Sequence, residues 1–478
     1  MVFCSQGRFF TPGRIRIAIG ILAGLLLAGC GGGGGDSNGG GAAPAAQVCP
    51  TPSANANTLN ERVYAYLQDT YLWCDQVPVL APNTFATVDA LVDRVRYRPT
   101  EYDRFSYVDT VANYIAFFEE GKSTGYGLGL SRLANNAIAI TYTEPGSPAT
   151  LGGLQRGLTL LAVNGFTTAQ LDAGFGGGYQ QQLGVTTAGV PARFTVVDGA
   201  IQRDISINSA TYSLTSVWRS ELLTPTLGYL QVKQFIATTK AEIRSTFAQA
   251  GWNAVTDLIV DLRYNGGGRV TEASRLASHI LGAPHAGKVF ASLQYNVRQA
   301  PGNNFTFTFG DTEGGVSFLR ATAIRRVAVI VSQRTCSASE EALASLRAIL
   351  PSANFFVVGG SATCGKPFGF LPQAFQMRPG IDDPNDPVVN AINFRSIAAD
   401  GTTDYIKGFP PRCVIADDLT RALTDPNEAL RRTAQTAVET GACPPGTAAV
   451  ARAQPLVERE ATLPDPLPAG LKRDHTTW

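Results

Sequence analysis

The chain has 478 residues, a length that allows about three domains at the usual size of roughly 150 residues each. The apolar fraction is 44% and the charged fraction 16%, so the sequence can bury sizeable cores and is not that of a wholly disordered chain. Lysine and arginine (39) nearly equal aspartate and glutamate (38), so no positive excess indicates a nucleic-acid partner.

The first 29 residues have the pattern of an export signal. Three arginines precede an apolar run over residues 17–27, and small residues follow it. The run is shorter than the roughly 20 apolar residues that span a bilayer. The sequence Leu-Ala-Gly-Cys at residues 27–30 resembles a bacterial lipobox, which implies that Cys30 becomes the lipidated N-terminus. An ordinary signal peptide followed by an unrelated cysteine is the alternative.

Residues 30–56 form a tether in this interpretation. The segment is rich in Gly, Ala and Pro and cannot bury a core, so we expect it to be flexible. An anchor followed by a tether predicts a lipid-anchored protein of the bacterial cell envelope. Glycine after Cys30 resembles the sorting pattern of outer-membrane lipoproteins, if the host is Gram-negative.

Six cysteines remain in the mature chain. An even number of cysteines in an exported protein predicts disulfides rather than free thiols. Six cysteines allow fifteen pairings, among which the sequence does not choose. We expect pairing in chain order: Cys49 with Cys74, Cys336 with Cys364, and Cys413 with Cys443.

Residues 57–122 predict a small helical module. Leu59, Val63 and Leu67 fall on one face of a helix, and residues 91–95 suggest a second helix. The stretches YLWCDQVP and YDRFSYVD in this module show no recognisable chemistry, and we expect their aromatic side chains to be buried.

Residues 123–208 predict a β-rich domain, because short alternating apolar runs are separated by Gly and Pro. The loop Gly127-Leu128-Gly129-Leu130 and the segment SPATLGGLQRGLTLLAVNG (147–165) together resemble a PDZ domain. The resemblance implies that residues 127–130 bind the terminal carboxylate of a peptide, which then adds as a strand. Leu158 departs from the family, which usually has Asp there. A β-rich domain without a ligand is the alternative.

Residues 209–443 alternate strands and helices. Strands are expected at 227–232, 257–263, 326–332 and 355–359, with helices at 241–250, 271–281 and 340–350. This alternation predicts βαβ units and a largely parallel sheet. A last helix is expected within residues 429–439, and residues 444–478 read as a loosely ordered tail.

Three segments that contain candidate catalytic residues follow predicted strands, where α/β folds place their sites. The glycines after Asn265 suit an oxyanion hole, Ser337 precedes a helix, and Lys366 has apolar neighbours that would lower its pKa by desolvation. Taken singly, these segments are better explained as a plain turn, a helix N-cap at Ser337 or Ser339, and an exposed loop lysine.

The three segments together, DLRYNGGG, TCSASE and GGSATCGKP, resemble the S41 peptidases, the C-terminal processing protease family. The resemblance extends over roughly residues 57–440 and implies an α/β multidomain fold with a ClpP/crotonase-like core. It implies a Ser–Lys endopeptidase in which Ser337 is the nucleophile, Lys366 the general base, and the N–H groups of Gly267 and Ala338 the oxyanion donors. We expect protein substrates recruited by their C-terminal tails, with no metal, cofactor or nucleic acid.

Two departures keep other functions open. Phe370 stands where the family usually has a Gln that orients the lysine, and the interval from Ser337 to Lys366 is a few residues longer than usual. A catalytically inactive peptide- or ligand-binding lipoprotein of the same fold is therefore an alternative. Weaker alternatives are serine chemistry assisted by His279 or His285, and a nucleophilic Cys336.

Overall fold

The computed structural model describes residues 47–98, 102–133 and 135–447. The predicted signal, Cys30, most of the tether and all of the tail beyond residue 447 lie outside these ranges, so their predictions stay predictions. Within the described ranges, no helix has both the length and the hydropathy that crossing a membrane requires.

The N-terminal module contains the two expected helices, α1 (Leu59–Thr70) and α2 (Val88–Val95). A capping box between Thr58 and Glu61 begins α1. The apolar faces of α1 and α2 are buried in one cluster. The module is not purely helical, because strand β1 (Tyr107–Thr110) precedes the short helix α3 (Val111–Tyr114).

Strand β1 belongs to a three-stranded sheet whose other members come from late in the chain. It pairs antiparallel with β21 (Pro387–Asn390), which in turn pairs with β20 (Gln373–Ala374). The four residues of β1, YVDT, do not alternate apolar and polar side chains, which is why the helical interpretation missed the strand. The N-terminal module is therefore completed by a segment almost 280 residues away in the chain.

The β-rich domain is entered and left through one antiparallel pair, β2 (Lys122–Gly125) with β9 (Ala210–Ser213). Between them lies a six-stranded sheet in which β3 is an edge strand. Its members are β3 (Leu128–Arg132), β4 (Ile138–Thr143), β5 (Thr159–Val163), β6 (Phe166–Thr167), β7 (Pro191–Asp198) and β8 (Ile201–Asn208). Three short helices accompany it: α4 (Pro148–Leu151), α5 (Thr168–Asp172) and α6 (Gly178–Leu183).

The core of the remaining chain is a mixed sheet of six strands. In spatial order they are β10 (Val217–Thr224), β11 (Leu227–Val232), β12 (Asp257–Asp261), β17 (Arg326–Ile330), β18 (Phe355–Gly359) and β23 (Cys413–Val414). Only β10 runs antiparallel to its neighbour, so the expected parallel βαβ arrangement is present from β11 to β23.

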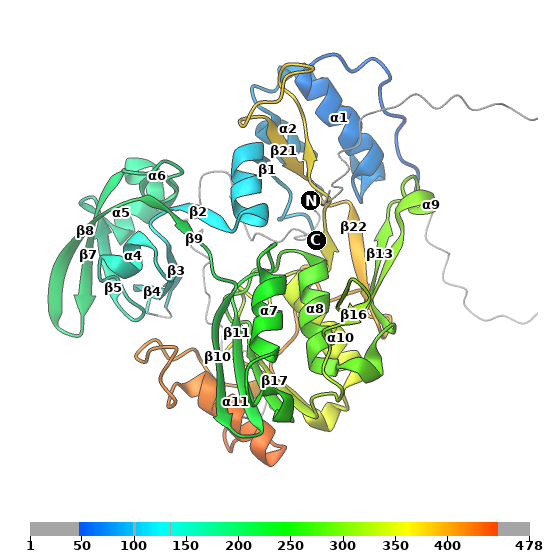
Figure 1. Cartoon of the computed structure of the whole chain (residues 1–478). Helices are drawn as coiled ribbons and strands as arrows, with labels where there is room; N and C mark the ends of the chain where they lie inside the picture. Colours follow the sequence, from blue (N-terminus) through cyan, green and yellow to red (C-terminus); the bar gives the residue numbers. More distant parts are fainter. Residues whose placement is uncertain (1–46, 99–101, 134, 448–478) are drawn as a thin grey trace, which may run out of the picture. The chain divides into compact units, whose positions relative to one another are not determined.

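Helices cover both faces of this sheet (Figure 1). Alternate residues of β17 point in opposite directions, with Val327 and Val329 in one core and Ala328 and Ile330 in the other. The first core is closed by α7 (Thr239–Phe247), α8 (Val270–Leu281) and α10 (Ala338–Ile349), and the second by α11 (Ala429–Thr440). Burial on both faces explains the continuous apolar runs of these strands.

A second sheet of four strands packs on the outer side of the first helical layer, since Ala291 and Ala398 enter that core. Its strands are β14 (Phe305–Thr308), β13 (Val289–Tyr295), β22 (Phe394–Ala398) and β19 (Phe368–Gly369). The short helix α9 (Ala300–Asn303) and the hairpin of β15 (Thr312–Glu313) with β16 (Val316–Ser317) complete the α-helices and strands of the described ranges.

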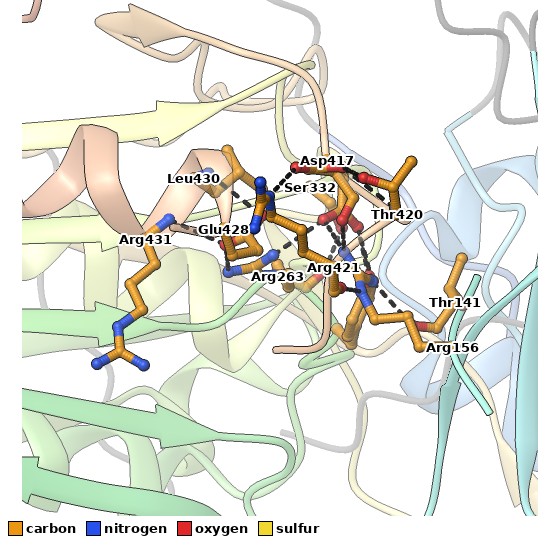
Figure 2. A network of polar contacts seen from close by, with 12 residues as sticks. Thr141, Arg156, Arg263, Ser332, Asp417, Thr420, Arg421, Glu428, Leu430 and Arg431 are labelled. Carbon is orange, nitrogen blue, oxygen red and sulfur yellow. Dashed lines mark hydrogen bonds and ion pairs between the residues drawn. The ribbon is translucent and has the colours of Figure 1, made fainter. Parts of the chain in front are cut away.

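A buried ionic network fixes the chain just after β12. The Arg263 side chain has no exposed surface and donates to Asp261, to Asp417 at 2.9 Å and to Glu428 at 2.9 Å, as Figure 2 shows for the latter two. Arg156 of the β-rich domain also donates to Asp417. Burial acts to raise the pKa of Asp417, but the charges of Arg156 and Arg263 outweigh it and hold that pKa at about 2.

We expect Arg263→Met to lower the free energy of unfolding by about 3–5 kcal/mol, because the variant leaves buried carboxylates without their cation. Arg421→Met is the control, since Arg421 pairs with Asp418 and Asp425 in solvent and its loss should lower the free energy of unfolding much less. Urea denaturation of both full-length variants measures the difference, and equal effects would contradict the structural role of Arg263.

Candidate active site

The three segments singled out in the sequence meet at one edge of the core sheet. Strands β12, β17 and β18 are parallel neighbours, so the segments after them leave the sheet side by side. The Cys336 N–H donates to the Asn265 carbonyl at 3.1 Å, and the Cys364 N–H donates to the Thr335 carbonyl at 3.0 Å. Backbone hydrogen bonds thus join the glycine turn to the serine segment, and the serine segment to the lysine segment.

The glycine turn is tightly packed against the strand connection before α7. A Cβ atom on Gly268 would lie 2.0 Å from the Phe235 carbonyl oxygen, so no other residue fits there. The Gly267 N–H, a predicted oxyanion donor, points instead to the Asn265 side-chain oxygen at 2.8 Å. The second predicted donor, Ala338, is the first residue of α10, where amides have no acceptor within the helix.

Ser337 has a backbone conformation that an ordinary helix cap does not adopt. Its φ is 53° and its ψ −118°, whereas N-cap residues are usually extended. Such strain in a residue other than glycine, held by the surrounding structure, is concentrated at functional sites. The conformation therefore favours a chemical role for Ser337 over simple capping.

Lys366 is buried, with 1% of its surface exposed. Its Nζ lies 4.7 Å from the centre of the Phe370 ring and 5.0 Å from that of Phe105. Phe370, which replaces the Gln expected from the family resemblance, therefore faces the lysine amine with an aromatic ring. Phe105 comes from the N-terminal module, so that module contributes directly to the surroundings of Lys366.

One buried carboxylate connects the segments of Ser337 and Lys366. Oε2 of Glu340 accepts the backbone N–H of Ser337 at 3.0 Å and that of Lys366 at 2.8 Å, so these two amides share a single oxygen. Oε1 accepts the Gly365 N–H at 2.8 Å and the Thr363 hydroxyl at 2.5 Å. Burial raises the pKa of Glu340, and these donors act against that rise.

A disulfide joins the same two segments. The structure links Cys336 to Cys364, with their Cα atoms 5.1 Å apart, and it also forms the Cys49–Cys74 and Cys413–Cys443 bonds. These are the pairs in chain order. Because the Cys336 sulfur is bonded, it provides no thiolate for catalysis in this state. For the same reason the cluster of Cys336, Glu340 and Cys364 offers no thiolate to a metal ion.

Both described histidines have partners away from Ser337. His279 lies in α8, where its Nε2 is 2.9 Å from an oxygen of Asp311 and its ring stacks on Phe247. His285 follows α8 and contacts the Lys288 amine at 3.3 Å. The structure therefore provides no support for serine chemistry assisted by either histidine.

The predicted carboxylate-binding loop borders the sheet edge of the β-rich domain. Gly127 has a φ of 76°, and Leu128, Gly129 and Leu130 begin the edge strand β3, with both leucine side chains in the core. The Arg334 guanidinium, three residues before Ser337, donates to the Leu130 carbonyl. The loop is thus in direct contact with the segment that carries Ser337.

The sequence interpretation missed three contributors to the site. Glu340 lies within the TCSASE segment, and its spacing from Ser337 is that of a capping box, which was the available signal. Phe105 and its neighbour Arg104, which donates to the Cys364 carbonyl, lie in the YDRFSYVD stretch, whose sequence gives no indication of their partners.

We expect Glu341 to make stability depend on pH. Burial raises its pKa from the ordinary 4.5 to about 7, and its carboxylate accepts from the Ser396 hydroxyl. Below pH 4.5 Glu341 is protonated in both the folded and the unfolded chain, so its titration costs no stability. As the pH rises from 4.5 to about 7, Glu341 ionises only in the unfolded chain, which lowers the free energy of unfolding.

Glu341→Gln keeps the acceptor for Ser396 and removes this titration. Between pH 5 and pH 8 the unmodified chain should lose about 2–3 kcal/mol more unfolding free energy than the variant. Urea denaturation at the two pH values measures the difference, and parallel profiles would show that Glu341 is not held protonated.

Comparison with known proteins gives two family matches. Residues 226–380 match the peptidase family S41, and residues 58–107 match the peptidase S41 N-terminal domain. The first match includes Ser337, Glu340 and Lys366, and the second covers α1, α2 and Phe105.

The individual proteins that are similar to this chain have low sequence identity to it. Two proteins from different strains of Staphylococcus epidermidis, assigned as CtpA-like serine proteases, are 25% identical over 199 residues, which is 41% of this chain and only 38% of theirs. The crystal structure of a Bacteroides fragilis protein assigned as an S41 protease aligns with a TM-score of 0.60 at 21% identity, covering 79% of this chain and 97% of that one, and so supports the fold. Residues 226–380 are thus similar to the S41 peptidase domain and residues 58–107 to the S41 N-terminal domain, and the chain is similar to the C-terminal processing proteases of that family.

Proposed function

We propose that the protein is a serine endopeptidase that uses Ser337 as nucleophile and Lys366 as general base. The observation that carries this proposal is the junction at Glu340, where one buried carboxylate binds the backbone amides of both residues. The strained backbone of Ser337 and the burial of Lys366 support it.

In the proposed reaction, the Ser337 hydroxyl attacks a peptide carbonyl while the neutral Lys366 amine accepts its proton. The resulting ammonium then protonates the leaving amine, and water completes hydrolysis of the acyl-enzyme by the reverse proton transfers. The Ala338 N–H, at the start of α10, is placed to stabilise the oxyanion. Gly267 can join it only after its N–H leaves the Asn265 oxygen.

The β-rich domain is proposed to be a PDZ-like module that recruits the C-terminal tails of substrates. Strand β3 is at a sheet edge, as strand addition requires, and its loop carries the expected glycines. The Arg334 guanidinium donates to the Leu130 carbonyl of β3. A peptide that pairs along β3 would therefore also affect the position of the segment next to Ser337. Lipid anchoring in the bacterial envelope through Cys30 completes the proposal.

A catalytically inactive binding protein is the second candidate. Two observations favour it: an aromatic ring replaces the expected Gln beside Lys366, and the Gly267 N–H is bonded to Asn265. A ring face attracts the ammonium form of lysine, which cannot act as a base. A serine-reactive fluorophosphonate separates the candidates, because an inactive protein remains unlabelled at every pH.

Ser337→Ala should lower hydrolysis of an unfolded casein substrate at least about a thousandfold without unfolding the full chain. Lys366→Met should give a similar loss, whereas Lys288→Met, which changes an exposed loop lysine, should retain activity. Release of peptides from casein measures all three. Cleavage by Ser337→Ala at the normal rate would refute the proposed nucleophile.

Adjacent buried glutamates offer a matched test of Glu340. Glu340→Gln places an amide donor against backbone donors, so we expect kcat to fall by at least about tenfold as the two disulfide-linked segments shift relative to each other. Glu341→Gln, on the same helix, should retain kcat. Equal kcat values for the two variants would show that the Glu340 junction does not position the site.

A further inference from the structure

A cavity in the N-terminal module lies outside the site described above. Its volume is about 590 Å³, and it is bordered by α1, α2, β1, α3 and the chain leading into β21, with Thr186 of the β-rich domain completing the lining. Leu59, Val108 and Met377 contribute apolar walls, while Asp89, Asp109 and Asn113 contribute polar groups. The cavity therefore combines an aliphatic lining with two carboxylates and, among those six, no basic side chain.

Asp109 is the unusual member of this lining, because only 3% of its surface is exposed and only half of its carboxylate is satisfied. Oδ1 accepts the Thr110 N–H at 2.7 Å and the Asn113 side-chain amide at 3.0 Å. Oδ2 has no hydrogen-bond partner among the described residues. A buried carboxylate oxygen without a donor is rare and requires an explanation.

The charge state of Asp109 agrees with an empty cation site. Burial raises the pKa of Asp109 to about 6, and the hydrogen bonds from Thr110 and Asn113 only partly oppose this rise. A cation next to Oδ2 would stabilise the ionised form and supply the missing donor. Asp89, an exposed residue of the α2 first turn, adds a second negative charge at the cavity rim.

Phe105 connects the cavity to the proposed catalytic lysine, because it contacts Lys366 and lies close to Asp109 in the sequence. Phe105, whose ring centre lies 5.0 Å from the Lys366 amine, is four residues before Asp109, so their Cα atoms are at most about 15 Å apart. Adding the distance from the Lys366 amine to the Phe105 Cα gives at most about 24 Å, and an extended peptide advances roughly 3.3 Å per residue, so a peptide at Lys366 would reach the cavity within about seven residues.

We propose that this cavity is a substrate subsite that binds a lysine or arginine side chain within about seven residues of the scissile bond. The aliphatic stem lies against Leu59, Val108 and Met377, and the cationic group donates to Oδ2 of Asp109. Its place as a substrate subsite rests on the proposed peptidase function; the recognition of a basic side chain does not.

The test uses fluorescein-labelled decapeptides of Ala, Gly and Ser that carry one lysine, or one norleucine at the same position. Fluorescence polarisation measures their binding to the full chain carrying Ser337→Ala, so catalysis is not required. We expect the lysine peptide to bind at least about tenfold more tightly than the norleucine peptide at neutral pH. Equal binding of the two peptides would overturn the proposal.

Asp109→Asn, added to the Ser337→Ala chain, should abolish the preference for lysine, whereas Asp382→Asn, an equal charge change at an exposed position, should preserve it. Met377→Lys provides a second variant at a partly exposed residue, and its own amine should compete for Asp109 and also remove the preference. A lysine preference that survives in folded Asp109→Asn or in Met377→Lys would overturn the proposal.

Cleavage of the same peptides by the active chain then tests the subsite role. If the lysine peptide binds preferentially and is cut with a higher kcat/KM than the norleucine peptide, the cavity is a substrate subsite. Preferential binding with no cleavage of any peptide or of casein would refute the peptidase function but would still support a site that binds basic side chains. Preferential binding with equal kcat/KM would overturn the subsite role.

Discussion

The geometry of the candidate site depends on the Glu340 carboxylate. It is buried at the start of α10, and its two oxygens receive donors from the segments of Ser337 and Lys366, which follow different strands. Burying a carboxylate is costly unless donors satisfy it, and here four donors do so. The same bonds that make the burial tolerable therefore help to set the distance between the serine and lysine segments.

Other interactions support this junction from three directions. The Cys336–Cys364 disulfide links the same two segments covalently, so that they remain joined when their hydrogen bonds fluctuate. The buried Arg263 network holds the glycine turn and, through Asp417, also reaches Arg156 of the β-rich domain. Arg334 connects the edge strand of that domain to the serine segment. The β-rich domain is thus bonded to both loops that border the site, which is the arrangement expected if peptide binding there affects Ser337.

The N-terminal module contributes more than a cover for the site. Phe105 and Phe370 surround the Lys366 amine with ring faces in place of the amide expected from the family resemblance. Aromatic faces stabilise an ammonium ion, while burial disfavours it, so the two effects oppose each other at the proposed base. The cavity around Asp109 is bordered by β1, which begins two residues after Phe105, so the proposed subsite is connected to the surroundings of Lys366, the proposed general base.

The sequence by itself determined the features that local patterns encode. Apolar periodicity predicted α1, α2 and the alternating strands and helices, and the segments after β12, β17 and β18 were recognised because parallel strands end at a common edge. Tertiary structure decided what depends on contacts between distant segments: the pairing of β1 with β21, the bond from Gly267 to Asn265, the place of Phe105 beside Lys366, and the unsatisfied oxygen of Asp109. The physical reason is that periodicity reports which face of an element is buried, whereas the partner of a buried polar or aromatic group is selected only when the whole chain has packed.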